Sequence, residues 1–167
     1  MFHRSVLNTP CRNLDLYFST EDQVRTLLAE SALTGACTSI GAEDAATLHE
    51  ESAPQRIAVL EGVMGYYDGL GGTTVTASAY HVAQTTNTSV ILIADGRGAS
   101  LTLVASLKGI IEYRQPNSVA GVIINRCTKS LAALLAPAIE QECGIPVLGY
   151  VPNKPEFALE SRHLGLV

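Results

Sequence analysis

The chain has 167 residues, of which 47% are apolar and 16% are charged, and its net charge is −5 at pH 7. These values suit one folded domain and exclude an intrinsically disordered chain. The acidic balance, and the lack of a basic run interleaved with aromatic residues, argue against a nucleic-acid binder.

The same composition predicts a soluble, cytoplasmic protein without a membrane partner. No stretch approaches the roughly 20 apolar residues of a membrane span, and the residues from Met1 to Arg4 begin no apolar signal segment. The four cysteines form no Cys-x-x-Cys pair, which favours free thiols in a reducing compartment.

The first part of the chain, 1–54, is expected to be an irregular and partly helical lead-in. Ser19 is followed three residues later by Asp22, which resembles a capping box at a helix N-terminus. The apolar spacing from Val24 onward predicts a helix that runs to about Leu33.

A different character begins after residue 54, where continuous apolar runs appear without polar alternation. Such runs are typical of strands that are buried on both faces of a parallel sheet. The runs cover residues 57–60, 89–94, 119–124 and 146–151.

Helical spacing of apolar residues lies between these runs, at 75–83, 103–111 and 131–139. Gly144 stands where a helix C-cap is expected, and Pro137 predicts a kink or a restart in the third helix. Alternating strands and helices predict a doubly wound α/β fold. We therefore expect a single domain over 1–167, with its α/β core at 55–152 and a tail at 153–167.

In such a sheet, ligands bind beyond the carboxyl ends of the strands. The polar residues that end the apolar runs, Glu61, Asp95 and Asn125, are therefore the first candidates for a site. Strand ends are also ordinary places for polar residues, so a purely structural role is the alternative for each of them.

Glu61 opens the glycine-rich stretch EGVMGYYDGLGG at 61–72. A carboxylate there can hold Mg²⁺ beside nucleotide phosphates, and the glycines let backbone N–H groups approach an anion. Asp68 supplies a second carboxylate, and two carboxylates with Mg²⁺ suit phosphoryl transfer. The alternative is a solvated turn, because Asp-Gly is a common turn dipeptide.

The string EGVMGYYDG at 61–69 resembles the signature of the cobyrinic acid a,c-diamide synthases and of the closely similar hydrogenobyrinic acid enzymes. Other segments also resemble this family in order, so that the resemblance covers essentially the whole chain. These segments are residues 1–4, 11–15, 95–98, 124–126 and 161–167.

The resemblance implies a fold and a reaction. The fold is a doubly wound, mostly parallel sheet of the P-loop, dethiobiotin-synthetase-like type, from which the N-terminal P-loop strand is missing. Family members use ATP and Mg²⁺ to phosphorylate the a and c carboxylates of the corrinoid, and ammonia then attacks each acyl phosphate. The ammonia comes from glutamine, which a separate C-terminal amidotransferase domain hydrolyses.

The resemblance also implies roles for residues of the glycine-rich loop and of the chain start. Glu61 is the expected catalytic and Mg²⁺-associated carboxylate at the phosphates. Asp68 is expected at the synthetase centre, near the reacting carboxylate or its metal. Tyr67 and His3 are expected to border the corrinoid substrate.

Cofactor contacts are implied at the ends of the later apolar runs. Asn125 is expected to hydrogen-bond the adenine of ATP, with Arg126 beside it. Asp95 is a further cofactor-binding candidate, although the family usually has a small residue or Cys where Gly96 stands.

The chain departs from the family pattern because it contains no G-x-x-x-x-G-K-[ST] motif. In the family the P-loop precedes the position that matches Met1, and the amidotransferase follows the position that matches Val167. We therefore expect the isolated chain to be inactive and to bind ATP and Mg²⁺ weakly or not at all.

Three readings stay open at this stage. The chain is a piece of an amidoligase, a subunit of a split enzyme, or a non-catalytic binding or assembly module with the same fold. A missing strand would leave an exposed sheet edge, which favours a homo-oligomer or a partner chain. A cobyric acid synthase-like or dethiobiotin synthetase-like enzyme is the weaker alternative.

Overall fold

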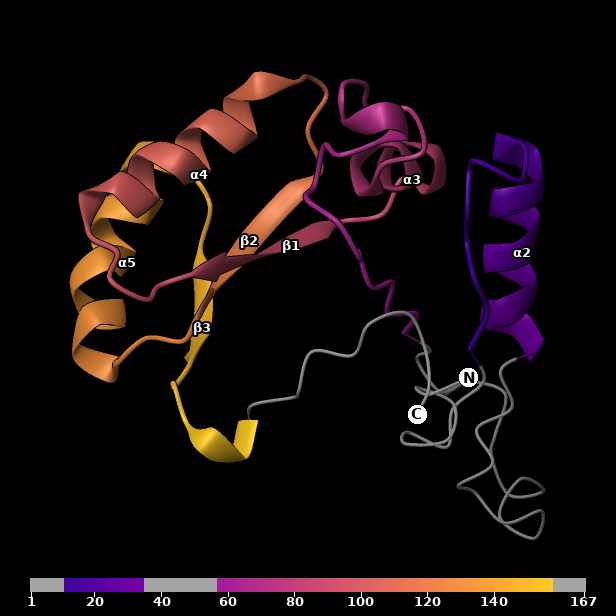
Figure 1. The fold of residues 1–167 in the computed structure, drawn as a ribbon. Helices are drawn as coiled ribbons and strands as arrows, with labels where there is room; N and C mark the ends of the chain where they lie inside the picture. The colour runs from indigo at the N-terminus through magenta and orange to yellow at the C-terminus, as the bar shows by residue number, and fades with distance from the viewer. Residues whose placement is uncertain (1–10, 35–56, 158–167) are drawn as a thin grey trace, which may run out of the picture. The chain divides into compact units, whose positions relative to one another are not determined.

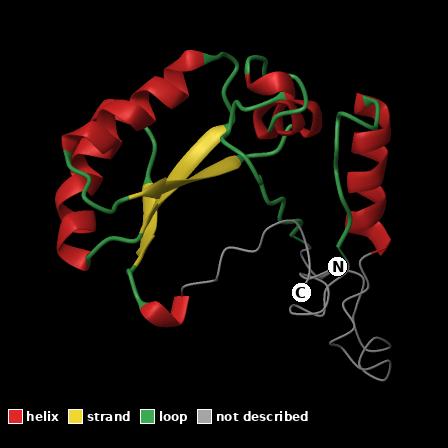
Figure 2. Cartoon of the chain, viewed as in Figure 1, coloured by secondary structure: helices red, strands yellow, loops and turns green. Residues whose placement is uncertain are grey.

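The computed structural model describes residues 11–34 and 57–157. They belong to two compact units, Met1–Thr88 and Ser89–Val167 (Figure 1). The N-terminal unit contains helices, and the C-terminal unit contains a sheet with its covering helices (Figure 2). The predicted single-domain organisation, with its boundaries near 54 and 152, stays a prediction.

The C-terminal unit confirms the predicted α/β fold with a parallel sheet. Its three strands lie in the order β1-β2-β3, and both neighbouring pairs run parallel. Its elements in chain order are β1 (Val90–Asp95), α4 (Leu101–Tyr113), β2 (Val119–Asn125), α5 (Lys129–Cys143), β3 (Val147–Val151) and a 3-10 turn at Pro155–Phe157.

Both helices of this unit cover the same face of the sheet (Figure 1). Val122 and Ile124 of β2 are fully buried there, together with Leu107 of α4 and Ile139 of α5. Full burial of such an aliphatic side chain contributes roughly 1.5–3 kcal/mol to stability, so this apolar layer stabilises the unit.

Alternation along β1 shows why only one face is covered by these helices. Leu92 and Ala94 point into the layer beneath α4 and α5, whereas Ile91 and Ile93 lie on the opposite face and are exposed. Side chains of a strand alternate between the two faces of a sheet. The continuous apolar run therefore supplies both faces, and these two helices bury one of them.

The predicted C-cap of α5 at Gly144 is confirmed, whereas a helix restart at Pro137 is not found. Thr128 accepts the Leu131 N–H at the N-terminus, and Gly144 ends the helix in the left-handed conformation. Pro137 lies inside one continuous helix rather than at a restart. Proline cannot donate to the carbonyl of Ala133, but Ala133 is exposed, so water can satisfy that carbonyl.

The N-terminal unit contains α2 (Glu21–Thr34), a 3-10 turn at Leu70–Gly72 and α3 (Ala79–Thr86). Arg25 of α2 donates its Nε–H to the backbone oxygen of Thr85 at 2.9 Å, which joins the two helices. The helix predicted after Ser19 is therefore confirmed.

The predicted N-cap of α2 is wrong by one residue. Thr20 accepts the Gln23 N–H on its hydroxyl at 3.3 Å, and its own N–H donates to the Gln23 side chain at 2.8 Å. This reciprocal pair is a capping box of the Thr-x-x-Gln type. Asp22 instead pairs with Arg25 on the helix surface, so Ser19 and Asp22 do not form the box.

The apolar run 57–60 was predicted to be a strand, and this is wrong. These residues form no regular element, and Ile57 and Val59 are exposed. Ala58 and Leu60 instead border a hollow that α2 also lines, through Leu28 among others. A four-residue run forms ladder hydrogen bonds only when it pairs with a neighbouring strand. Here Ala58 and Leu60 lie beside a helix instead.

Two further observations bear on the sequence predictions. His3 lies outside the described residues. Among residues 11–34 and 57–157, no helix combines the length and the apolar composition that crossing a bilayer requires.

Candidate functional site

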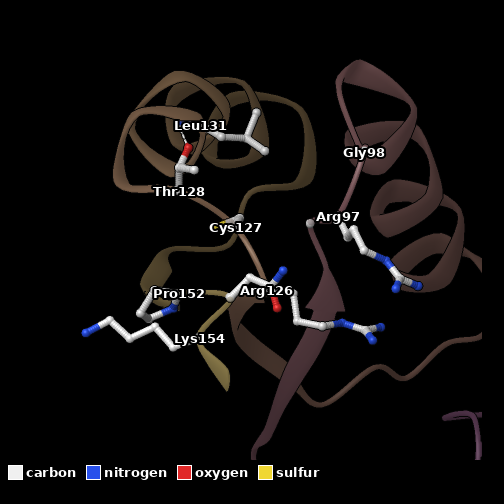
Figure 3. A pocket seen from close by; sticks show the side chains of 10 residues that line it. Arg97, Gly98, Arg126, Cys127, Thr128, Leu131, Pro152 and Lys154 are labelled. Atoms are coloured by element: carbon white, nitrogen blue, oxygen red, sulfur yellow. Dashed lines mark hydrogen bonds between the residues drawn. The ribbon is translucent and has the colours of Figure 1, made fainter. Parts of the chain in front are cut away.

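A pocket of about 440 Å³ lies at the carboxyl ends of the three strands. Its walls come from the loop after β1, the turn after β2 and the segment after β3 (Figure 3). Parallel strands bring these three connections to one edge of the sheet, which is where α/β proteins place ligands. The lining residues are Gly96, Arg97, Gly98, Arg126, Cys127, Thr128, Leu131, Pro152, Asn153 and Lys154.

The pocket combines apolar walls with positive charge. Cys127 and Leu131 are its apolar members on one side, and Pro152 lies across from them (Figure 3). Lys154 extends away from the guanidinium groups of Arg97 and Arg126 in this view (Figure 3). Positive charge on either side of a concave apolar site favours an anionic ligand that also has an apolar part.

Asp95 and Asn125 end neighbouring strands and lie opposite one another in the register of β1 and β2. The Asp95 carboxylate receives a two-pronged ion pair from Arg126, with Nε donating to Oδ1 at 3.1 Å and Nη2 donating to Oδ2. The Arg97 backbone N–H also donates to Asp95 Oδ1 at 3.1 Å. One carboxylate thus connects the loop after β1 with the turn after β2.

These contacts lower the pKa of Asp95 below its ordinary value of 3.8. The backbone hydrogen bond from Arg97 is the largest cause; desolvation, next in size, opposes it, and the hydrogen bond and charge of Arg126 lower the pKa further. Hydrogen bonds to the charged form favour that form. Asp95 is therefore ionised at neutral pH.

The backbone turn at Arg126 has an uncommon conformation. Its φ is +55°, in the left-handed region that residues other than glycine seldom adopt. Asn125 accepts the Arg126 N–H on its side-chain oxygen at 2.9 Å, and the next N–H, of Cys127, donates to Val151 at 3.2 Å. Contacts on both sides of Arg126 therefore hold it in this conformation.

Gly96 fits against this turn only because it has no side chain. Its N–H donates to the backbone oxygen of Asn125 at 2.7 Å. A Cβ at this position would lie 2.7 Å from both Cys127 Cβ and Ile124 Cγ2, closer than side-chain atoms normally approach. The close approach of the two loops at one end of the pocket therefore requires glycine.

The glycine-rich loop lies in the N-terminal unit, where Glu61 and Asp68 are both exposed. The Asp68 N–H donates to the Gly65 oxygen at 2.9 Å and closes a turn. A Cβ at Gly65 would lie 2.3 Å from Asp68 Oδ2, so the carboxylate folds back over this glycine. The loop sequence thus fixes where the second carboxylate lies.

Tyr67 belongs to a cluster of three tyrosine rings in the same unit. Its ring centroid lies 4.7 Å from that of Tyr66 and 5.1 Å from that of Tyr80. Burial, with smaller contributions from Tyr67 and Tyr80, raises the pKa of Tyr66 to about 12, and its hydroxyl is buried without a hydrogen-bond partner. The cluster supports the loop that carries Asp68.

No group of three or more His, Cys, Asp or Glu side chains within residues 11–34 and 57–157 could hold a metal ion. Mg²⁺ at a nucleotide site commonly uses only one or two carboxylates, with phosphates and water completing its shell. The exposed hard oxygens of Glu61 and Asp68 fit that requirement. The metal role of Glu61 therefore stays a prediction.

The predicted site residues fall into two groups. Asp95, Asn125 and Arg126 meet at the strand ends of the C-terminal unit, whereas Glu61 and Tyr67 belong to the loop of the N-terminal unit, together with Asp68. Their roles stay predictions.

Several pocket-lining residues were not among the site residues that the sequence predicted. Arg97, Thr128 and Lys154 each follow a strand within a few residues, and that position was the signal that could have found them.

Comparison with known proteins finds relatives that are named cobyrinate a,c-diamide synthase. A cobyrinate a,c-diamide synthase from Thermoplasma acidophilum is 38% identical over 167 aligned residues, which cover 99% of this chain and 33% of that protein. Those from Listeria innocua and Gloeobacter violaceus are 35% and 37% identical over similar spans. No family model matches the chain, and no solved structure matches it at a significant level.

The chain therefore spans about a third of the length of the curated relatives it matches. The alignment covers nearly every residue of this chain, and so it spans the segments 61–69, 95–98 and 124–126. The resemblance that those motifs predicted is confirmed: over essentially its whole length, the chain is similar to part of the cobyrinate a,c-diamide synthases.

Proposed function

We propose that the chain contributes nucleotide-binding and synthetase residues to an enzyme that amidates the a and c carboxylates of cobyrinic or hydrogenobyrinic acid in cobalamin biosynthesis. The observation that carries this proposal is the identity of 34–38% to cobyrinate a,c-diamide synthases over nearly the whole chain. In this proposal ATP activates each carboxylate as an acyl phosphate, and ammonia derived from glutamine displaces the phosphate.

The pocket that follows β1, β2 and β3 is the proposed nucleotide-binding site. Its apolar walls at Leu131 and Pro152 suit a base, and the cations Arg97 and Lys154 suit the charge of the phosphates. Asn125 is the proposed adenine contact beside the pocket. Its side-chain oxygen already accepts the Arg126 N–H, so its amide N–H groups would face the base.

Mg²⁺, when bound, would neutralise charge on the phosphates as the phosphoryl group transfers. Glu61 is the proposed carboxylate that holds it. Asp68 would orient the reacting carboxylate or assist at the metal, and Tyr67 would border the corrinoid. Both carboxylates lie on one turning loop, which supports a shared task for them.

The proposal is tested by calorimetry of ATP binding to the pure chain, with and without Mg²⁺. Because the chain contains no P-loop motif, we expect weak affinity, in the millimolar range that corresponds to about −4 kcal/mol. Glu61→Ala is expected to remove the Mg²⁺-dependent part of the binding. Glu30→Ala, which removes a carboxylate from α2, is the matched control and should leave binding unchanged.

A chimaera tests the reaction itself. The chain would replace the matching third of the Thermoplasma acidophilum synthase, and ATP-dependent amidation of cobyrinic acid would be measured. We expect activity in the folded chimaera and its loss in the Glu61→Gln version. A folded chimaera that binds ATP but leaves cobyrinic acid unchanged would contradict the proposed substrate.

A further inference from the structure

Asp95 was predicted to contact the cofactor, but its carboxylate is already occupied by protein groups. Oδ1 accepts hydrogen bonds from the Arg97 N–H and from Arg126 Nε, both at 3.1 Å. Oδ2 accepts another from Arg126 Nη2. A carboxylate has about four acceptor positions, so three of them serve the protein.

These bonds connect two different walls of the pocket. Arg97 belongs to the loop after β1, and Arg126 belongs to the turn after β2, and both line the pocket. Asp95 itself does not line it. Its influence on a ligand must therefore pass through the groups that it holds.

The turn at Arg126 has a backbone conformation that its surroundings must stabilise. Arg126 has a φ of +55°, and such backbone conformations cost roughly 1–3 kcal/mol unless their surroundings impose them. The guanidinium of Arg126 is anchored at Asp95, and the backbone beside it is anchored at Asn125 and Val151. Loss of the Asp95 anchor would let the Arg126 stem move within the pocket.

We propose that Asp95 is a positioning residue of this pocket: its carboxylate ties the loop at 96–98 to the turn at 126–128 and holds both walls in place for the ligand. The inference rests on the proposed role of the pocket in nucleotide binding. It assigns Arg126 a planar, two-pronged contact that lysine cannot reproduce.

The negative charge of Asp95 lets a positioning role be distinguished from a purely electrostatic one by the direction in which ATP affinity changes. Asp95 is an anion near a site proposed for an anionic nucleotide, so its charge alone would repel ATP. If Asp95 acted only through its charge, neutralising it would strengthen ATP binding and leave adenosine binding unchanged. A positioning role predicts weaker binding of both ligands.

The test measures ATP and adenosine dissociation constants by NMR titration for the wild type, Asp95→Asn, Arg126→Ala and the double variant. We expect Asp95→Asn to weaken both ligands by roughly tenfold, which corresponds to a coupling of about 1.4 kcal/mol. In the Arg126→Ala background, Asp95→Asn should change either affinity by less than about twofold. Arg126→Lys serves as a second variant that keeps the charge, and it should weaken both ligands as Asp95→Asn does.

Glu112→Gln is the matched control, because it removes the same charge from the exposed side of α4. It should leave both affinities unchanged. Equal or tighter ATP binding by Asp95→Asn would overturn the positioning role, as would losses that simply add in the double variant.

Hydrogen exchange of the Arg97 and Cys127 backbone amides separates this inference from the proposed function. Asp95→Asn should speed exchange at both amides by at least about fivefold, while amides in the centre of α5 keep their rates. If the wild type binds neither ATP nor adenosine, the nucleotide role fails while the exchange result still decides the positioning role. Unchanged exchange at both amides would overturn it.

Discussion

At the scale of single residues, the pocket depends on Gly96, where a Cβ would approach Cys127 and Ile124 to 2.7 Å. We predict that Gly96→Ala destabilises the protein by roughly 1–3 kcal/mol, because the turn after β2 must shift to admit the methyl group. Urea unfolding measures the change. Gly109→Ala in α4 is the control, since a Cβ there meets nothing within 4 Å, and it should stabilise by roughly 0.5–1 kcal/mol. The same sign for both variants would contradict this account.

The contacts of Asp95 with the Arg97 N–H and with Arg126 predict a dependence of stability on pH. Its folded-state pKa is lowered from 3.8, so the unfolded chain binds this proton more readily than the folded chain. The stabilisation is therefore present above 3.8 and is lost as the pH falls through the folded-state pKa. We expect the difference in unfolding free energy between wild type and Asp95→Asn to be constant near neutral pH and to shrink in this acidic range. A difference that does not change down to the acid limit of folding would be evidence against these contacts of Asp95.

The strand pattern marked Asp95 and Asn125 as candidates, whereas Arg126 was expected beside them only from the family resemblance. Asp95 and Asn125 each end an apolar run, and the parallel register places them side by side. The sequence could not indicate that Arg126 folds back onto Asp95. That contact depends on a left-handed backbone at Arg126, which no local residue preference favours.

At the scale of elements, α2 offers a prediction that distinguishes two capping assignments. The structure gives the N-cap to Thr20, whose hydroxyl accepts the Gln23 N–H. Thr20→Ala should cost about 1 kcal/mol of unfolding free energy, whereas Ser19→Ala should change it by less than about 0.5 kcal/mol. Thermal or urea unfolding compares the two variants. A larger loss for Ser19→Ala would favour the cap that the sequence alone suggested.

The strands and helices of the C-terminal unit could be predicted from the spacing of their apolar residues. In this unit, that spacing agrees with which side chains the fold buries. The run at 57–60 has the same composition as a strand, yet it forms no ladder in the described structure. Strand formation depends on a partner strand that can be distant in sequence, and a four-residue run carries no information about that partner. Pro137 shows the converse case, since packing of Leu135 and Ile139 keeps α5 continuous through it.

At the scale of the whole molecule, the chain matches about a third of each of its relatives and contains no P-loop motif. We predict that the pure chain shows no ATP hydrolysis above background, because phosphoryl transfer needs groups that surround the phosphates. Phosphate release with and without Mg²⁺ measures this directly. Turnover that disappears in Glu61→Ala would contradict the prediction and would mean that the chain alone assembles a working phosphate site.

The central claim is that the pocket beyond β1, β2 and β3 binds the nucleotide, and an amide NMR titration of the chain with ATP and Mg²⁺ tests it most directly. The account predicts shifts at millimolar ATP that concentrate in residues 96–98, 126–128 and 153–154. Unchanged spectra at these positions, with shifts confined to other segments or with no shifts anywhere, would contradict it.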